Sequence, residues 1–459
     1  MRKKKLIGTC LTKEIVDVSQ EKDKLMKTLA TYTLGCKVNT YDTEAIVKLF
    51  IDRGYETSDF DSFSDIYIIN TCTVTNLSDK KSRQALRRCK KINPNGIVVV
   101  MGCYAQVAAD EIKEIEDVDI VIGTKDRKNI VDIVEGYKPG ISALNYVTDI
   151  QNDEAFEYFS VSSFEGKTRA FLKVQDGCDR FCTYCIIPYA RGNVRSRQPD
   201  DAVNEARQLE KNGFKEIVLA GIHVASYGKD LTNIDLLELI KYIHDVDGIE
   251  RIRLSSIDPV VVDSKFVNAL ANLPKVCDHF HMSLQSGCNK TLNAMGRRYS
   301  REQYLQSVLL LRDAFENAAL TTDIISGFPG ETEDDFLESY EFLEHIGFSK
   351  IHGFPYSPRK GTKAANYDNQ VPKAIKEERN RKISILSDRL SIQFREKFIG
   401  KEMDVLYEAL SLSDETDAKL NCDFKEIDGK SYVGYTTNYI KVSTKSCENL
   451  INVIKPTVL

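Results

Sequence analysis

The stretch Gly177-Cys178-Asp179-Arg180-Phe181-Cys182-Thr183-Tyr184-Cys185 follows an apolar run, Phe171-Leu172-Lys173-Val174, which predicts a buried strand. Its cysteines are spaced C-x3-C-x2-C. Three thiolates can ligate three irons of a four-iron cluster and leave the fourth iron without a protein ligand. A zinc site or unrelated buried thiols are the alternatives, but zinc ribbons favour two separate C-x2-C pairs, which this stretch lacks. The spacing therefore favours a cluster with one open iron.

An open iron can bind a small chelating ligand, such as the amino and carboxylate groups of S-adenosylmethionine (SAM). An electron delivered there breaks the sulfonium bond and releases a radical. With Ile186-Ile187-Pro188-Tyr189-Ala190-Arg191-Gly192 behind it, the motif resembles the radical SAM superfamily. That resemblance implies a SAM-binding [4Fe-4S] cluster on Cys178, Cys182 and Cys185.

Composition limits the class of protein. A chain of 459 residues with 42% hydrophobic residues is long enough for two or three domains. No apolar run reaches the ~18 residues that span a bilayer, and Met1-Arg2-Lys3-Lys4-Lys5 leads into no signal-peptide core. We therefore expect a cytoplasmic protein without a membrane partner, whose twelve cysteines are metal ligands or reduced thiols. The net charge of −5 argues against a broadly basic nucleic-acid surface but allows local basic patches.

The amino-terminal region alternates strands and helices. Residues 1–26 are charged and aperiodic, which predicts a disordered extension with Met26 as a second candidate start. Residues 27–138 predict a doubly wound parallel sheet of an α/β domain. The expected strands are Thr28–Leu34, Asp65–Ile69, Ile97–Met101 and Val118–Ile122, and the expected helices are Thr43–Arg53, Ser78–Lys91, Ala108–Ile115 and Ile130–Val134.

Three cysteines of this region occupy matching places. Cys36, Cys72 and Cys103 each follow a predicted strand by one to three residues. The carboxyl ends of parallel strands open onto one crevice, so we expect these thiols to converge. Gly35 and Gly102 precede two of them and suit tight turns beside a bulky group. Taken singly, each cysteine is explained equally well as a buried thiol.

The phrases Thr33-Leu34-Gly35-Cys36-Lys37-Val38-Asn39, Asn70-Thr71-Cys72-Thr73-Val74-Thr75 and Gly102-Cys103 resemble the methylthiotransferases, radical enzymes that insert a methylthio group into RNA or protein. The resemblance covers essentially everything after Met26. It implies a second [4Fe-4S] cluster, also with an open iron, on Cys36, Cys72 and Cys103, and no catalytic residues beyond the cluster ligands.

The segment Asn76-Leu77-Ser78-Asp79-Lys80-Lys81-Ser82-Arg83-Gln84 is most similar to the branch that modifies N6-threonylcarbamoyladenosine at position 37 of tRNAs reading ANN codons. The implied partners are tRNA, a flavodoxin- or ferredoxin-type electron donor and a sulfur source. Sister branches act on isopentenyladenosine or on a ribosomal-protein aspartate, and a cluster carrier or electron-transfer protein is the alternative outside enzymes.

The central region follows a predicted linker, residues 139–163, which is poor in apolar faces. Residues 164–391 contain six strand and helix units, which predict an open (β/α)6 barrel, the radical SAM core domain. The expected strands are Ala170–Val174, Glu216–Ala220, Arg251–Leu254, His279–Leu284, Thr321–Ile325 and Lys350–Phe354. The cluster loop follows the first of them, where barrel enzymes carry their chemistry.

Small and polar residues follow the other barrel strands. Glycines there allow close backbone approach, and hydroxyl and amide groups suit a ribose or a carboxylate. In the superfamily such strand ends line the SAM pocket, although turn chemistry explains each single residue equally well. The SAM-binding candidates are Tyr184, Gly221, Ser255, Ser283, Gln285, Ser326 and Gly327.

Two regions are candidates for RNA contact. Arg191, Arg195 and Arg197 follow the cluster motif closely, which suggests that they steer RNA phosphates toward the open iron. Residues 392–457 read as short strands with turns, and Phe398-Ile399-Gly400-Lys401 resembles the TRAM domain, a small RNA-binding antiparallel β-barrel. Its expected strands are Glu402–Leu406, Ala418–Asn421, Ser431–Tyr435, Tyr439–Val442 and Asn449–Ile454.

Overall fold

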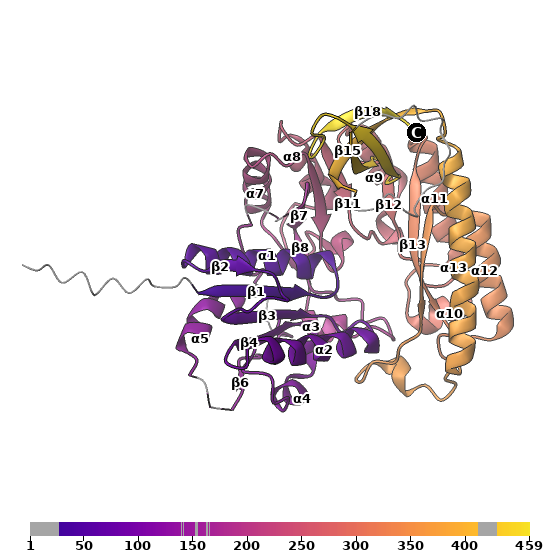
Figure 1. The fold of residues 1–459 in the computed structure, drawn as a ribbon. Coiled ribbons are helices and arrows are strands. Elements are labelled where there is room, and N and C mark those ends of the chain that lie inside the picture. The colour runs from indigo at the N-terminus through magenta and orange to yellow at the C-terminus, as the bar shows by residue number, and fades with distance from the viewer. Residues whose placement is uncertain are drawn as a thin grey trace, which may run out of the picture.

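The computed structural model describes residues 27–138, 140, 142–151, 155–161, 164, 166–411 and 429–459. The predicted extension 1–26 and the predicted strand Ala418–Asn421 lie outside these residues. Figure 1 shows an amino-terminal sheet in indigo, a central set of strands and helices, and a small carboxyl-terminal sheet in yellow. Within the described part of the chain, no helix is long and apolar enough to cross a membrane.

The amino-terminal domain is a six-stranded parallel sheet in the order β2-β1-β3-β4-β5-β6, which confirms the predicted doubly wound sheet. Alternate residues of β3 enter opposite cores: Ile66 and Ile68 pack on one face, and Tyr67 and Ile69 on the other. The strands are β1 (Thr28–Thr33), β2 (Glu56–Ser58), β3 (Ile66–Thr71), β4 (Ile97–Gly102), β5 (Ile120–Val121) and β6 (Leu144–Asn145). The helices are α1 (Lys37–Asp52), α2 (Asn76–Ile92), α3 (Cys103–Val107), α4 (Ala109–Lys113), η1 (Arg127–Asn129) and α5 (Ile130–Gly136).

Two edge strands of this sheet were not expected. Strand β2 reads Glu-Thr-Ser and is largely exposed, so it carries no apolar signal. Strand β6 lies inside the predicted linker and pairs with β5 through only two residues. The segment after residue 138 therefore begins as part of the amino-terminal sheet.

The central domain contains the six expected parallel strands as two sheets, β11-β10-β7 and β12-β13-β14. Isolated bridges, Ile252 to Val276 and Ile257 to Met282, join them into one curved wall. The strands are β7 (Arg169–Lys173), β10 (Glu216–Ala220), β11 (Arg251–Leu254), β12 (His279–His281), β13 (Ala319–Ser326) and β14 (Lys350–Pro355), with a short hairpin of β8 (Gln175–Asp176) and β9 (Arg195–Ser196).

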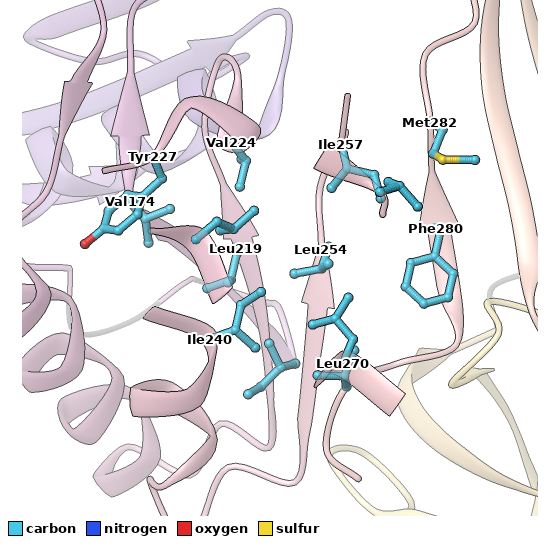
Figure 2. Packing of buried hydrophobic residues seen from close by; sticks show 14 of the residues in the cluster. Val174, Leu219, Val224, Tyr227, Ile240, Leu254, Ile257, Leu270, Phe280 and Met282 are labelled. Carbon is cyan, nitrogen blue, oxygen red and sulfur yellow. The ribbon is translucent and has the colours of Figure 1, made fainter. Parts of the chain in front are cut away.

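One face of this wall is apolar and the other is polar. Leu219, Leu254 and Phe280 belong to the core under the outer helices (Figure 2), whereas Arg253 and His281 alternate with such residues and face inward. Helices α11 and α12 begin with capping boxes at Ser300 and Thr332. The helices are α6 (Ile187–Arg191), α7 (Pro199–Lys211), α8 (Leu236–His244), α9 (Ser264–Ala271), α10 (Asn289–Met295), α11 (Arg301–Ala314) and α12 (Glu333–Ile346), with η2 (Val224–Ser226), η3 (Pro259–Val261) and η4 (Lys363–Asn366).

Helix α13 (Lys373–Glu396) leads into a four-stranded antiparallel sheet in the order β17-β16-β15-β18. Its strands are β15 (Glu402–Leu410), β16 (Lys430–Thr436), β17 (Lys441–Ser446) and β18 (Ile454–Val458). This sheet closes the amino-terminal end of the central strands. The Arg251 guanidinium donates to the carbonyls of Tyr435 (3.0 Å) and Asp404 (2.8 Å), and Arg253 donates to that of Thr437 (2.7 Å).

Candidate active site

The C-x3-C-x2-C loop lies at the carboxyl end of β7, as predicted. Gly177 has φ 73°, and a Cβ there would lie 1.8 Å from the Asn193 carbonyl oxygen, so the turn requires glycine. Burial raises the pKa of the Cys178 thiol to about 11 and that of Cys185 to about 12, and neighbouring thiols add to both shifts. The three thiols are therefore within electrostatic reach of one another, and binding iron requires them to lose protons.

An arginine that the sequence analysis missed lies beside this loop. The Arg297 guanidinium donates to Cys182 Sγ at 3.6 Å and lies 3.9 Å from Asp258. Burial opposes ionisation of Asp258, but its hydrogen bond with His223 and the charge of Arg297 lower its pKa to about 2. The sequence signal was Gly296, whose φ of 75° ends α10 next to Cys182. Arg297 provides positive charge next to the thiols, where a bound cluster is anionic.

The SAM candidates lie where the sequence analysis placed them, at strand ends, but their contacts differ. Ser255 follows β11, and its buried Oγ has no hydrogen-bond partner in the described structure, which suits a ligand contact. Ser326 instead donates to the Lys376 carbonyl at 3.2 Å. The Gly327 amide donates to the Glu331 carboxylate, so Ser326 fixes helix α13 (Lys373–Glu396) and Gly327 serves the turn into α12.

The other candidates are also placed around the loop. Tyr184 packs in a small apolar cluster with Met295 and Phe328, and burial raises its pKa. The Ser283 carbonyl accepts from Tyr299 Oη at 2.7 Å. A Cβ on Gly221 would meet Gln175 Oε1 at 2.9 Å, and Gln285 adopts φ 69°, a left-handed conformation that is unusual for a residue with a side chain.

The second set of cysteines converges at the carboxyl edge of the amino-terminal sheet. Cys36 precedes α1, Cys72 follows β3 and Cys103 begins α3. A Cβ on Gly35 would lie 3.0 Å from Cys72 Sγ, so the loops of Cys36 and Cys72 touch. Burial raises the pKa of Cys103 to about 11, with Arg191 opposing and the thiols of Cys72 and Cys36 adding to the shift.

Both thiol sets have the donor chemistry of an iron–sulfur cluster. Among the residues that the structure describes, no group of three or more His, Cys, Asp and Glu side chains is placed to hold a single metal ion. A four-iron cluster is wider than an ion and takes one thiolate on each of its ligated irons. The Cys36, Cys72 and Cys103 set and the Cys178, Cys182 and Cys185 set each offer three such thiols on glycine-containing turns.

Comparisons with known proteins agree with this geometry. The chain matches the models of the radical SAM superfamily over residues 172–343 and of uncharacterized protein family UPF0004 over residues 28–123. It is 42% identical to the threonylcarbamoyladenosine tRNA methylthiotransferase MtaB of Bacillus subtilis, over 94% of this chain and 93% of the relative. The protein of the same name from Aquifex aeolicus is 41% identical, over 82% of this chain and 92% of its own.

The chain belongs to the radical SAM tRNA methylthiotransferases. A tRNA-2-methylthio-N(6)-dimethylallyladenosine synthase from Thermoanaerobacter is 36% identical, over 88% of this chain and 86% of the relative. Among solved structures, the radical SAM methyltransferase TsrM from Kitasatospora setae shares the fold with a TM-score of 0.54 and 14% identity, over 74% of this chain and 77% of that one.

The methylthiotransferase buries the three arginines that we expected to contact RNA. Arg191 and Arg197 are 0% exposed and Arg195 is 3% exposed. Arg197 pairs with Glu205 of α7 at 2.6 Å. The prediction of an RNA-facing arginine patch is therefore wrong, because all three side chains are buried and buried acids pair with Arg191 and Arg197.

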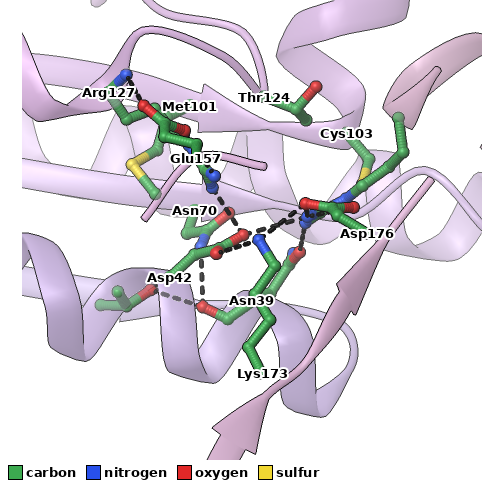
Figure 3. Close-up of polar contacts among 12 residues, drawn as sticks. Asn39, Asp42, Asn70, Met101, Cys103, Thr124, Arg127, Glu157, Lys173 and Asp176 are labelled. Atoms are coloured by element: carbon green, nitrogen blue, oxygen red, sulfur yellow. Dashed lines mark hydrogen bonds and ion pairs between the residues drawn. The ribbon is translucent and has the colours of Figure 1, made fainter. Parts of the chain in front are cut away.

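A charge network joins the two domains of the methylthiotransferase between its cysteine sites (Figure 3). Asp42 of α1 pairs with Arg127 (2.5 Å), Lys173 (2.9 Å) and Arg191 (3.1 Å), and Asp176 pairs with Arg191 at 3.0 Å. Burial opposes ionisation of both acids, but the neighbouring cations hold their pKa values well below the usual range. Both carboxylates therefore stay charged, and the domains are joined by ionic contacts.

A further contact from the central domain reaches the Cys72 loop. The Arg359 guanidinium donates to Thr73 Oγ1 (2.6 Å), to Asp79 (2.6 Å) and to Asn76 Oδ1 (2.6 Å). Thr73 directly follows Cys72, and Asp79 lies in the first turn of α2. The central domain therefore helps to shape the amino-terminal cysteine site, which sequence patterns did not indicate.

Proposed function

We propose that this methylthiotransferase uses two [4Fe-4S] clusters to replace the C2–H bond of N6-threonylcarbamoyladenosine-37, in tRNAs reading ANN codons, by C–S–CH3. The observation that carries the two-cluster proposal is the contact of Arg191 with Cys103 of the amino-terminal thiol set at 3.2 Å, because Arg191 also ends the helix that follows Cys185 of the other set. A group to be transferred and a carbon to be activated must lie close together, and a residue shared by both thiol loops supports such an arrangement.

The reaction needs a radical because the C2–H bond of an adenine offers no ionic route at neutral pH. When bound, the cluster on Cys178, Cys182 and Cys185 supplies the electron that cleaves SAM, and the cluster on Cys36, Cys72 and Cys103 carries the sulfur to be methylated. Two SAM molecules are used: one gives the methyl group and leaves as S-adenosylhomocysteine, and the other, cleaved by one electron from the electron donor, leaves as methionine and as 5′-deoxyadenosine that carries the C2 hydrogen. Arg297, which donates to Cys182 Sγ, and Ser255, whose buried Oγ has no hydrogen-bond partner in the described structure, offer polar contacts for SAM.

The threonylcarbamoyl substrate is supported by Lys37, the residue after Cys36. Its side chain keeps solvent contact, yet burial and the charges of Arg169 and Arg253 lower its pKa. In the described structure Arg169 pairs with Glu408 and Arg253 with Glu216, whereas no ion pair involves Lys37. A cation in this setting suits a carboxylate.

The alternative nucleoside substrates differ in whether they carry a negative charge that could pair with Lys37. The threonylcarbamoyl group carries a carboxylate, and an isopentenyl group is apolar, so only the former compensates Lys37. The relatives at 42% and 41% identity carry threonylcarbamoyladenosine names, and the relative at 36% carries a dimethylallyladenosine name. We further propose tRNA, a flavodoxin- or ferredoxin-type electron donor and a sulfur source as partners, and the cytoplasm as the place of action.

Mass spectrometry of nucleosides from total tRNA, in cells with and without the gene, tests the proposal. We expect the deletion to lose the methylthio form and to accumulate plain threonylcarbamoyladenosine. An unchanged threonylcarbamoyladenosine pool with loss of methylthio-isopentenyladenosine would assign the sister substrate. If neither nucleoside changes, purified ribosomal protein becomes the substrate to test, and failure of the reduced protein to cleave SAM would indicate a cluster carrier.

A further inference from the structure

Arg191 contacts groups from both domains. It ends α6, and its guanidinium is fully buried. Its Nε donates to Cys103 Sγ at 3.2 Å. Its Nη1 donates to Asp176 at 3.0 Å and to Asp42 at 3.1 Å, and its Nη2 donates to Asn39 Oδ1 at 2.5 Å. One rigid fork of donors therefore holds a thiol, two carboxylates and an amide.

The partners of Arg191 lead directly to other cysteine loops. Asn39 lies in the first turn of α1, three residues after Cys36, and its Nδ2 donates to the Thr71 carbonyl, next to Cys72, at 3.0 Å. Asp176 accepts from the Gly177 amide at 2.8 Å, one residue before Cys178. Displacement of the guanidinium would loosen both cysteine sites.

We infer that Arg191 is a positioning residue that fixes the two cysteine sites relative to each other, and that its Nε–H tunes the cluster on Cys36, Cys72 and Cys103. This inference rests on the proposed function, in which that site holds a [4Fe-4S] cluster. A hydrogen bond to a ligating sulfur stabilises the electron added on reduction, so it makes the reduction potential less negative.

The same network contains a matched control. Arg127 is equally buried and pairs with Asp42 at 2.5 Å and with Glu157 at 2.8 Å. Within the described residues, no hydrogen bond links Arg127 to a cysteine. A lysine keeps the charge at either position but lacks the planar fork of arginine. Arg191→Lys and Arg127→Lys therefore disturb the network alike, and only Arg191→Lys removes a donor to sulfur.

The test uses full-length protein in which Cys178, Cys182 and Cys185 are replaced by Ala, so that only the amino-terminal cluster is observed. An EPR-monitored redox titration should give a more negative potential with Arg191→Lys and an unchanged one with Arg127→Lys. In protein with all six cysteines, Arg191→Lys should lower methylthio product by roughly 10–100-fold while 5′-deoxyadenosine still forms. An unchanged potential, or equal shifts in both variants, would overturn the inference.

A second measurement needs no substitution of Arg191 and covers the case in which Arg191→Lys does not fold. The chain with only the amino-terminal cluster is labelled with [15N]arginine, and pulsed EPR of its reduced cluster should show a 15N coupling that Arg127→Lys retains. Its absence would overturn the inference. Iron analysis distinguishes failure of the proposed function from failure of this inference. About four irons in the six-cysteine protein would refute the two-cluster function, whereas about eight irons with an unshifted reduction potential would refute only the role of Arg191.

Discussion

The two cysteine sites of this methylthiotransferase are built in opposite ways. Cys178, Cys182 and Cys185 come from one loop, shaped by Gly177 and by Arg297 of the same domain. Cys36, Cys72 and Cys103 come from three loops, and arginines of the other domain hold two of those loops. The first site is completed within one domain and the second depends on contacts between domains, so damage to the domain junction should affect them unequally.

The largest expected effect separates the roles of the two sites. Cys178→Ala should abolish both 5′-deoxyadenosine formation and methylthio product, because the radical originates there. Cys36→Ala should abolish the methylthio product and leave SAM cleavage. Chromatography with mass spectrometry of both products measures this, with Cys447→Ala, an exposed thiol, as the control. A Cys36→Ala protein that still made methylthiolated tRNA would end the two-cluster model.

Lys37→Met tests whether Lys37, beside the amino-terminal cysteine site, recognises the carboxylate of the substrate. Loss of a charge-assisted contact to the substrate carboxylate should raise the KM for threonylcarbamoylated tRNA about tenfold or more. The KM for tRNA that lacks this group should not change. Lys48→Met, on the same helix and paired with Asp52 at 2.7 Å on the surface, is the matched control. Equal KM values for Lys37→Met and the parent enzyme would argue against carboxylate recognition by Lys37.

Arg359→Met tests the dependence of the Cys72 loop on the central domain. The pair of Arg359 and Asp79 is nearly buried, with side chains 9% and 11% exposed. Leaving Asp79 without its partner should reduce the free energy of unfolding by roughly 3 kcal/mol. Iron should be lost from the amino-terminal site and kept at the C-x3-C-x2-C loop. Arg389→Met removes an exposed surface pair with Glu344 and should leave the free energy of unfolding nearly unchanged.

The smallest expected effect is a pH dependence of the iron-free protein. Burial raises the pKa of Cys178 to about 11 and of Cys185 to about 12, while thiols of an unfolded chain ionise near about 8.5. The folded state binds these protons more tightly, so stability is complete below about pH 8.5 and declines as the pH rises toward the folded values, by on the order of 1 kcal/mol per thiol at pH 9.5. Thermal unfolding from pH 7.5 to 10 measures this decline. The stability of a Cys178→Ala and Cys185→Ala double variant should decline less over this pH range. An equal decline in both proteins would show that these two thiols do not cause it.

The sequence predicted the local features of this molecule well. Strands Glu216–Ala220 and Arg251–Leu254 have the predicted bounds, because short apolar alternations between turn residues determine them. The cysteine loops lie at strand ends because parallel strands share one carboxyl edge. These features depend on residues close together along the chain.

Features that depend on distant partners were missed. Helix α1 begins at Lys37 and not at the predicted Thr43, because Asn39 and Asp42, poor helix formers, are stabilised by buried contacts from the other domain. Arg191 and Asp42 meet across 149 positions. No local pattern distinguishes such an arginine from one that faces RNA.

The carboxyl-terminal sheet is fixed to the amino-terminal end of the central strands. Arg251 and Arg253 bind its backbone carbonyls, and Tyr439 stacks on His279 with ring centroids 4.8 Å apart. A sheet held by these contacts keeps a fixed position relative to the central strands, unlike a domain on a flexible linker. The C-x3-C-x2-C loop follows the other, carboxyl end of β7, so the sheet and this loop keep a set separation along the wall of central strands.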